Sequence, residues 1–416
     1  MSMDPLLSYI VLSYNYERYI GKTLQSIFDQ TVQDFEIVVV DDCSTDNSVE
    51  IVLAIKDARI RLFKNERNLG GAASYNRAVL EARGKWLVNL DADDWIDPRK
   101  AEIQLKVAAS DPRLDVIGSH VTIYDEDDNP HPSSDVLEAV FNNEYDLNLV
   151  DTWIGANHLC RSSTMVRAIA HKQWGLDDPS MIRAPDYELW TRALRDGCRF
   201  AVVPQRLTFI RAHSRGVTHG DPVSGLLELS YAMQRNLVPL AATRSLFNSV
   251  ARIVAWACRH PSLSQLPPVQ AHRLIGALMQ PAIISNYQHF LAMLTGQSDH
   301  FQLAELGRRL FAFVGPDADA YQEVRKLHND IQSYIDARDY FKNESEKWEL
   351  AFKGLQAEHQ IMSASLSLLN PTGAQVFVKP EPEYAEHTMS DSWSPAARQG
   401  SFFARVWTLF TRLLPK

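Results

Sequence analysis

The chain has 416 residues, of which 45% are hydrophobic and 22% charged, as in an ordinary folded protein of two or three domains. Its formal net charge of −9 argues against a nucleic-acid-binding protein, because such proteins usually carry a broad basic patch. The cysteines Cys43, Cys160, Cys198 and Cys258 form no CxxC pair and no zinc spacing, so we expect reduced thiols in a cytoplasmic protein. We expect no signal peptide, and no stretch reaches the roughly 20 apolar residues of a membrane span.

The first 110 residues alternate strand and helix patterns. Apolar runs predict strands, and apolar residues at helical spacing predict the helices that connect them. The expected strands are 8–13, 35–40, 60–63 and 85–90, and the expected helices are 17–30, 46–56 and 72–82. This order predicts an α/β domain with a parallel sheet covered by helices on both faces. In such sheets ligands bind beyond the carboxyl ends of the strands, so we expect the functional residues to lie there.

Residues 111–220 show a more mixed pattern, with short strands expected at 116–124 and 201–211 and a helix at 186–195. The polar run at 125–132 predicts the tip of a hairpin. We therefore expect an N-terminal catalytic domain over residues 1–220.

The chain becomes helical from about Pro222, which predicts a helical domain over 221–369. Within it, residues 321–369 carry an apolar seam with a period of roughly 3.5 residues. A packed surface helix and a self-associating coiled coil fit that seam about equally, because it is interrupted at Arg338, Ser345 and His359. Residues 370–400 carry four prolines and few aliphatic side chains, which predicts a disordered linker.

Residues 401–416, SFFARVWTLFTRLLPK, have apolar side chains at helical spacing and basic ones opposite. This pattern predicts a basic amphipathic helix that lies on an anionic membrane surface. The alternatives are that it packs back on the helical domain or docks on a partner protein.

Three carboxylates, Asp91, Asp93 and Asp94, directly follow the strand expected at 85–90. Unpaired charges this close raise each other's pKa. A divalent cation, Mn2+ or Mg2+, relieves the repulsion and shares its oxygen ligands with substrate phosphates. The alternative for Asp94, and for Asp97, is helix capping.

A second polar cluster, VVVDDCSTDNS, spans residues 38–48 and follows the strand at 35–40. Ser44 or Thr45 is expected to cap the next helix. Capping does not explain Asp41 and Asp42, and a carboxylate at this edge can accept the imide N–H of a uracil-like base.

These segments, SYIVLSYNYERYIGKTLQSIFDQTVQDFEIVVVDDCSTDNS, NERNLGGAASYNRAV and GKWLVNLDADDWIDP, resemble glycosyltransferase family 2 over roughly residues 6–215. The resemblance implies the GT-A fold, a Rossmann-like mixed sheet flanked by helices. It also implies that Asp42 pairs with the base, and that Asp41 is structural or near the ribose. Asp93 would ligate the metal, and Asp91 would face the ribose and a metal-bound water. The remaining nucleotide-sugar contacts would come from Tyr14, Asn15 and Asn76.

The segment APDYELW resembles the acidic motif of that family, with Pro185 in place of the usual glutamate. The resemblance implies that Asp186 is the general base that takes the proton of the acceptor hydroxyl. Capping of its own helix is compatible with that role. Trp190 would stack on a sugar or pack in the core.

The segment RAHSR resembles the Tyr-Arg-x-His segment of the family, with Ile210 replacing the tyrosine. Arg211 and His213 would meet the diphosphate, and His213 would also ligate the metal. His158 would face the acceptor or have an ordinary packing role.

The sequence thus predicts an inverting, metal-dependent glycosyltransferase that takes a sugar from a nucleotide-diphosphate donor, UDP-linked by preference. The acceptor would be a glycan or lipid-linked glycan of a bacterial surface, reached from the inner face of the cytoplasmic membrane. A sugar nucleotidyltransferase would need a glycine-rich basic loop after the first strand, which LSYNYERYIG does not offer. A degenerate scaffold would have lost a carboxylate, whereas Asp42, Asp91, Asp93 and Asp186 are all present.

Overall fold

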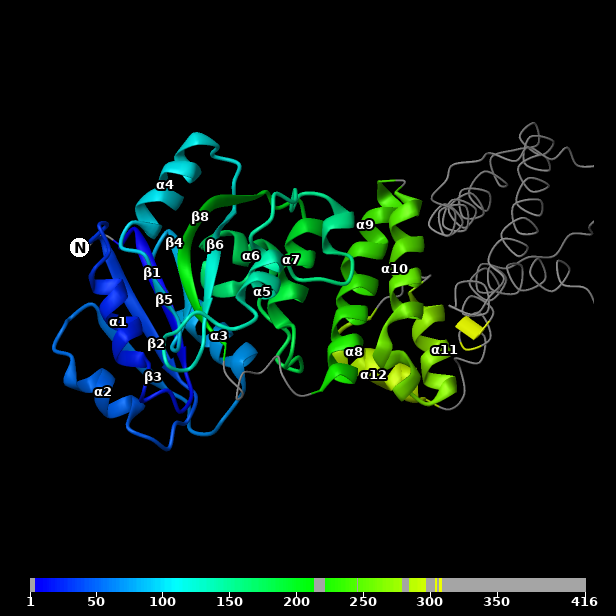
Figure 1. Cartoon of the computed structure of the whole chain (residues 1–416), viewed down its shortest axis with the longest axis horizontal. Coiled ribbons are helices and arrows are strands. Elements are labelled where there is room, and N and C mark those ends of the chain that lie inside the picture. Colours follow the sequence, from blue (N-terminus) through cyan, green and yellow to red (C-terminus); the bar gives the residue numbers. More distant parts are fainter. Residues whose placement is uncertain are drawn as a thin grey trace, which may run out of the picture. The chain divides into compact units, whose positions relative to one another are not determined.

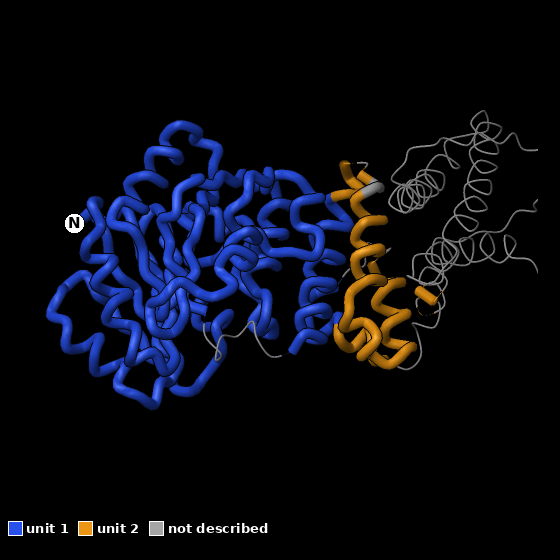
Figure 2. Tube along the Cα trace, in the orientation of Figure 1, with its two compact units in different colours: residues 1–240, 283–290 blue, residues 241–282, 291–416 orange. Residues whose placement is uncertain are grey.

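The computed structural model describes residues 4–212, 221–244, 246–278, 284–296, 304 and 307–308. The chain forms two compact units, coloured separately in Figure 2: residues 1–240 with 283–290, and residues 241–282 with 291–416. The predictions for His213, the seam at 321–369, the linker at 370–400 and the helix at 401–416 lie outside the described residues.

The first unit is built on a mixed sheet with the strand order β3-β2-β1-β4-β7-β6-β8-β5 (Figure 1). Its strands are β1 (Leu7–Ser13), β2 (Phe35–Asp41), β3 (Ile60–Lys64), β4 (Trp86–Asp91), β5 (Trp95–Ile96), β6 (Val116–Tyr124), β7 (Met165–Arg167) and β8 (Phe200–Arg211). The connecting helices are α1 (Ile20–Phe28), α2 (Ser48–Ala54), α3 (Gly71–Glu81), α4 (Lys100–Ser110), α5 (Ser134–Phe141), α6 (Ala170–Trp174) and α7 (Pro185–Arg195). Short 3-10 helices lie at Val150–Trp153 and Arg161–Ser163.

The first four strands in the order, β3, β2, β1 and β4, run parallel, as the alternating pattern predicts. Every residue of β2 is buried, as expected for an inner strand of a parallel sheet that helices cover on both faces. Helix α1 joins β1 and β2 in one apolar cluster, whereas α3 contacts the same strands without joining that cluster. The two helices therefore cover opposite faces.

The register brings the ends of these strands level with one another. Ser13 of β1 pairs with Asp41 of β2, and Leu12 pairs with Asp91 of β4. The polar residues that follow the three strands consequently meet at one edge of the sheet.

The other half of the sheet makes it mixed. Strand β7 is antiparallel to both β4 and β6, and β6 runs parallel to β8. A tight turn forms at 125–132, closed by Asp125 N–H donating to the Asn129 carbonyl (2.8 Å). Tyr124 and Pro130 form an antiparallel bridge across this turn, so the chain reverses there as at the tip of a hairpin, as predicted. The chain then continues into α5, and β6 pairs along its length with the distant β8.

The chain is helical from Pro222 onward in the described residues, as predicted. The elements are α8 (Pro222–Ala232), a π-helix (Met233–Leu237), α9 (Val238–Thr243), α10 (Phe247–Arg259), a 3-10 helix (Pro261–Gln265), α11 (Pro268–Ala277) and α12 (Tyr287–Thr295). Asp221 caps α8 by accepting hydrogen bonds from the Val223 and Ser224 N–H groups. None of the helices described here combines the length and apolar character that crossing a bilayer requires.

Candidate functional site

Asp42 lies just beyond β2 and holds the segment that leads into α3. Its Oδ1 accepts hydrogen bonds from Asn65 Nδ2 (2.7 Å) and Leu69 N (2.8 Å), and its Oδ2 accepts one from Gly70 N (2.8 Å). Gly70 adopts φ = 86°, a conformation that favours glycine. Since a carboxylate oxygen accommodates two hydrogen bonds, Oδ2 keeps capacity for an N–H of a ligand.

Asn15 ties the end of β1 to the loop after β2. Its backbone N–H donates to Ser44 Oγ (2.9 Å), and its side-chain Oδ1 accepts the Thr45 N–H (2.8 Å). Ser44 in turn donates to Asp41, which is almost completely buried. The expectation that Ser44 or Thr45 caps α2 is wrong, because that helix begins later, after Asn47. Tyr14 is 44% exposed at the same edge.

The acids that follow β4 form a buried negative cluster. Burial raises the pKa of Asp91 to about 6, with further contributions from the charges of Asp93 and Asp186, and the Arg161 guanidinium opposes this shift. Burial also raises the pKa of Asp94, with further contributions from the charges of Asp93 and Asp91, and the Asp94 Oδ1 accepts the Arg211 N–H (2.9 Å). The cluster concentrates negative charge where strands β1, β2 and β4 end.

Asp186 is at the second position of α7 and belongs to the same cluster. Its Oδ2 accepts a hydrogen bond from Asn157 Nδ2 (2.8 Å), and its Oδ1 accepts the Tyr187 N–H (2.8 Å). The structure therefore brings Asp186 close enough to Asp91 and Asp93 for their charges to interact, although Asp186 is distant from them in the sequence.

Two neighbours of Asp186 on α7 have structural roles. Trp190 is fully buried and donates its indole N–H to the Leu159 carbonyl (3.2 Å), which settles its role as core packing. Glu188 is also fully buried and forms an ion pair with Arg192 (2.9 Å).

Arg211 points inward beside the acidic cluster. Its Nε donates to the Asp93 carbonyl (3.1 Å), and its Nη1 forms an ion pair with Asp128 (2.6 Å). The guanidinium also lies over the rings of Tyr19 and Trp95. In this structure Arg211 therefore links the turn at 125–128 to Asp93 through its hydrogen bonds and its ion pair.

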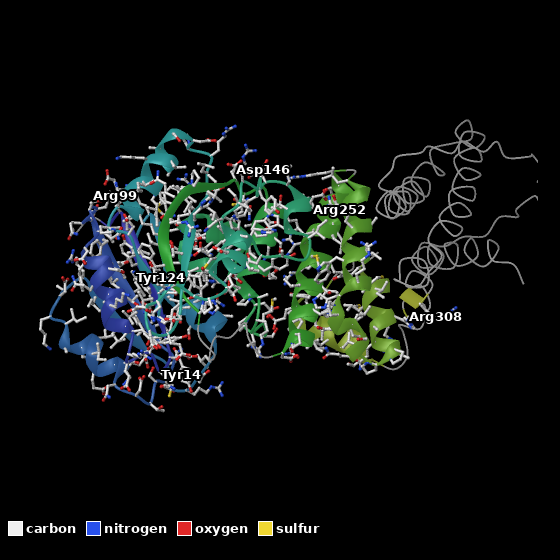
Figure 3. All side chains as sticks on the ribbon, in the orientation of Figure 1. Tyr14, Arg99, Tyr124, Asp146, Arg252 and Arg308 are labelled. Atoms are coloured by element: carbon white, nitrogen blue, oxygen red, sulfur yellow. The ribbon has the colours of Figure 1, made fainter. Side chains whose placement is uncertain are left out.

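Asn76 and His158 are both occupied by protein partners. The Asn76 amide donates to the Asp177 carbonyl (2.9 Å) and accepts the Asp177 N–H (2.8 Å). The His158 ring lies 2.8 Å from the Val140 carbonyl and packs edge-to-face with Tyr145. In Figure 3, Asp146 is labelled towards the top of the view and Tyr14 towards the bottom. His158 thus has the packing role in this structure.

Several residues around the cluster carry no motif in the sequence: Asn157, Arg161, Ser162, Asp177 and Glu228. Arg161 forms an ion pair with Asp177 (2.7 Å) and lies over the Tyr75 ring (3.9 Å). Ser162 Oγ accepts the Asp91 N–H (3.1 Å). These partners come from irregular or distant segments, so neither periodicity nor spacing in the sequence indicates them.

Comparison with known proteins bears on the family and the fold of the chain. The family model for glycosyl transferase family 2 matches residues 8–174. The chain is 33% identical over 216 residues to the uncharacterized glycosyltransferase MJ1057 of Methanocaldococcus jannaschii, covering 51% of this chain and 72% of that protein. It is 29% identical over 215 residues to an Escherichia coli enzyme, UDP-Glc:alpha-D-GlcNAc-diphosphoundecaprenol beta-1,3-glucosyltransferase WfaP, covering 51% of this chain and 80% of that one.

Among solved structures, residues 1–349 of S. aureus TarS in complex with UDP share the fold. The TM-score is 0.52 at 17% identity, with 79% of this chain and 91% of that chain covered. The sequence match and the mixed sheet flanked by helices lead to the same conclusion: the chain is a glycosyltransferase that belongs to family 2 and has the GT-A fold.

Proposed function

We propose that this glycosyltransferase is inverting and moves a sugar from a nucleotide-diphosphate donor, UDP-linked, to a hydroxyl of a glycan or lipid-linked glycan in bacterial surface synthesis. The observation that carries the proposal is the meeting of Asp91, Asp93 and Asp186 at the edge of the sheet that Asp42 also borders. The name of the relative WfaP gives UDP-Glc as its donor and alpha-D-GlcNAc-diphosphoundecaprenol as its acceptor, which supports the donor and acceptor classes proposed for this chain.

In this proposal the nucleotide lies across the ends of β1 and β2. The Oδ2 atom of Asp42 accepts the imide N–H of the base, while Tyr14 and Asn15 line the pocket. Asn76 supports this pocket from α3 through its two hydrogen bonds to the Asp177 backbone. Arg211 acts on the diphosphate side, beside the Asp93 carbonyl.

Asp91 and Asp93 would hold a Mn2+ or Mg2+ ion. Their chemistry fits, because buried carboxylates that repel one another are stabilised by a hard cation. Within the described residues no group of three or more His, Cys, Asp or Glu side chains is arranged as a metal site. Phosphate oxygens of the donor would therefore complete the coordination, together with His213, which lies outside the described residues. When bound, the ion neutralises the charge of the departing diphosphate.

Asp186 performs the proton transfer. Its carboxylate takes the proton of the acceptor hydroxyl while that oxygen forms a bond to the anomeric carbon. The bond from this carbon to the diphosphate breaks, and its electron pair leaves with the diphosphate. Because attack and departure occur on opposite faces, the anomeric configuration inverts.

Metal removal tests the proposal. We expect EDTA to abolish both donor hydrolysis and sugar transfer, and added Mn2+ or Mg2+ to restore them, because the buried acids otherwise repel the diphosphate. A thermal-shift screen of nucleotide sugars with Mn2+ identifies the donor, since the tightest-binding one raises the unfolding midpoint most. Full activity in the chelator would contradict the metal assignment.

A further inference from the structure

The Asp186 carboxylate is held by one hydrogen bond on each oxygen. Oδ1 receives the Tyr187 backbone N–H, and Oδ2 receives Nδ2 of Asn157, each at 2.8 Å. The first donor is fixed by the helix, so the second is the side chain that decides which way the carboxyl group faces.

Asn157 is itself oriented by the chain. Its Oδ1 accepts the Leu159 N–H (3.2 Å), so its NH2 group is the end that meets Asp186. This orientation suits the chemistry, because an ionised carboxylate only accepts hydrogen bonds and the NH2 group only donates them.

The segment 157–162 that carries Asn157 also reaches the acidic strand. Ser162 accepts the Asp91 N–H (3.1 Å), and Arg161 forms an ion pair with Asp177 (2.7 Å). One short stretch of chain thus contacts Asp186 on α7 and the backbone of Asp91 on β4, so it sets the spacing between them.

The backbone that leads into α7 is fixed independently of Asn157. Glu228 on α8 is buried, and its carboxylate accepts the N–H groups of Ile182 (2.9 Å), Arg183 (2.8 Å) and Ala184 (2.8 Å). Loss of the Asn157 amide would therefore leave the backbone of Asp186 in place and remove only the hydrogen bond to Oδ2 of its carboxylate.

We propose that Asn157 is a positioning residue that aims the Asp186 carboxylate at the acceptor hydroxyl. The inference rests on the proposed role of Asp186 as the base. If Asn157 is removed, its effect on the orientation of Asp186 and its effect on the basicity of Asp186 change the reaction rate in opposite directions. A hydrogen bond to a carboxylate lowers its proton affinity, so basicity alone would make the enzyme faster without Asn157. The loss of orientation would make the enzyme slower, because misplacement of a catalytic group by about 1 Å lowers the rate by up to about 100-fold.

The experiment uses the full chain with Mn2+ and follows UDP release from UDP-glucose and UDP-N-acetylglucosamine, with water or simple alkyl glycosides as acceptors. Asn157→Ala should lower kcat roughly 10- to 100-fold and leave the KM for the donor within about twofold. Asn142→Ala is the matched control, because its amide makes two equally short hydrogen bonds, but only to the Val121 backbone. This control should keep its kcat even where its unfolding midpoint falls.

A double-mutant cycle tests separately whether Asp186 is the base and whether Asn157 positions it. Asn157→Ala should have no further effect in an Asp186→Asn background, because Asn157 acts through that carboxylate. Normal turnover by Asp186→Asn would overturn the proposed base and this inference with it. An impaired Asp186→Asn beside a normal Asn157→Ala would overturn this inference alone. If Asn157→Ala does not fold, Asn157→Asp replaces it, since it keeps the size while losing the NH2 donor, and the same reduced kcat is expected.

Discussion

At the scale of single residues, the carboxyl group of Asp186 has a fixed orientation and lies close to other acidic side chains. Its two hydrogen bonds orient it, and its charge contributes to the raised pKa of Asp91. A replacement that keeps the shape therefore isolates the proton-transfer role.

Asp186→Asn should reduce turnover by roughly 100-fold or more, because the amide keeps the volume and loses the proton affinity of a general base. Donor binding, measured by calorimetry, should hardly change. Glu188 cannot substitute, because it is buried in its ion pair with Arg192. Undiminished turnover would therefore require a base elsewhere in the chain.

Lys100, at the start of α4, is fully buried, and its Nζ has no hydrogen-bond partner among the described residues. Burial lowers its pKa to about 7. The folded protein consequently binds fewer protons than the unfolded chain between about pH 7 and 10.5, so this lysine destabilises the fold at and below neutral pH.

Lys100→Met should raise the free energy of unfolding at pH 7 by roughly 2 kcal/mol or more, because it removes a buried charge and keeps a long flexible side chain. The advantage should shrink as the pH rises towards 10, where the unfolded lysine also loses its proton. Denaturant titrations at pH 7 and pH 10 measure both effects. A variant less stable than the parent at pH 7 would show that Nζ has a compensating partner.

At the scale of elements, the parallel strands and the acids that follow them could be predicted from sequence, because apolar runs and polar ends are local patterns. Asp91 is the last residue of β4 and Asp93 comes just after it, and the pairing register places both at the edge of the sheet where Asp42 lies. The three-residue strand β7 and the segment carrying Asn157 could not be predicted. Both are irregular or short, and their partners are distant in the chain.

The loop between β3 and α3 depends on Asp42, which accepts hydrogen bonds from Asn65, Leu69 and Gly70. Asp42→Asn should raise the KM for the donor about tenfold or more, because an NH2 group then faces backbone donors that need an acceptor. Asn65→Ala is the control, since it loosens the same loop without changing Asp42, and its KM effect should be smaller. Equal KM effects would mean that Asp42 acts on the donor only through the loop.

At the scale of the whole molecule, we predict that the tail at 401–416 brings the enzyme to a lipid-linked acceptor. It lies outside the described residues, so the prediction rests on its amphipathic pattern. The full chain should float with anionic liposomes and be partly released by high salt, whereas a chain ending at Gly400 should stay in solution. If the two chains behaved alike, the tail would be assigned to its own helical domain or to a protein partner.

The eight residues at 283–290 belong to the first unit although more than 40 residues separate them from its main part. Asp178 accepts hydrogen bonds from the Tyr287 N–H (2.9 Å) and the Tyr231 hydroxyl (3.1 Å), and Phe290 packs against Tyr231. Residues 241–282, which belong to the second unit, therefore lie in the sequence between two segments of the first unit. A recombinant fragment that stops at residue 240 would contain every carboxylate of the site and still expose the aromatic face of Tyr231, so it should aggregate. A fragment that extends through Gly296 keeps that face covered.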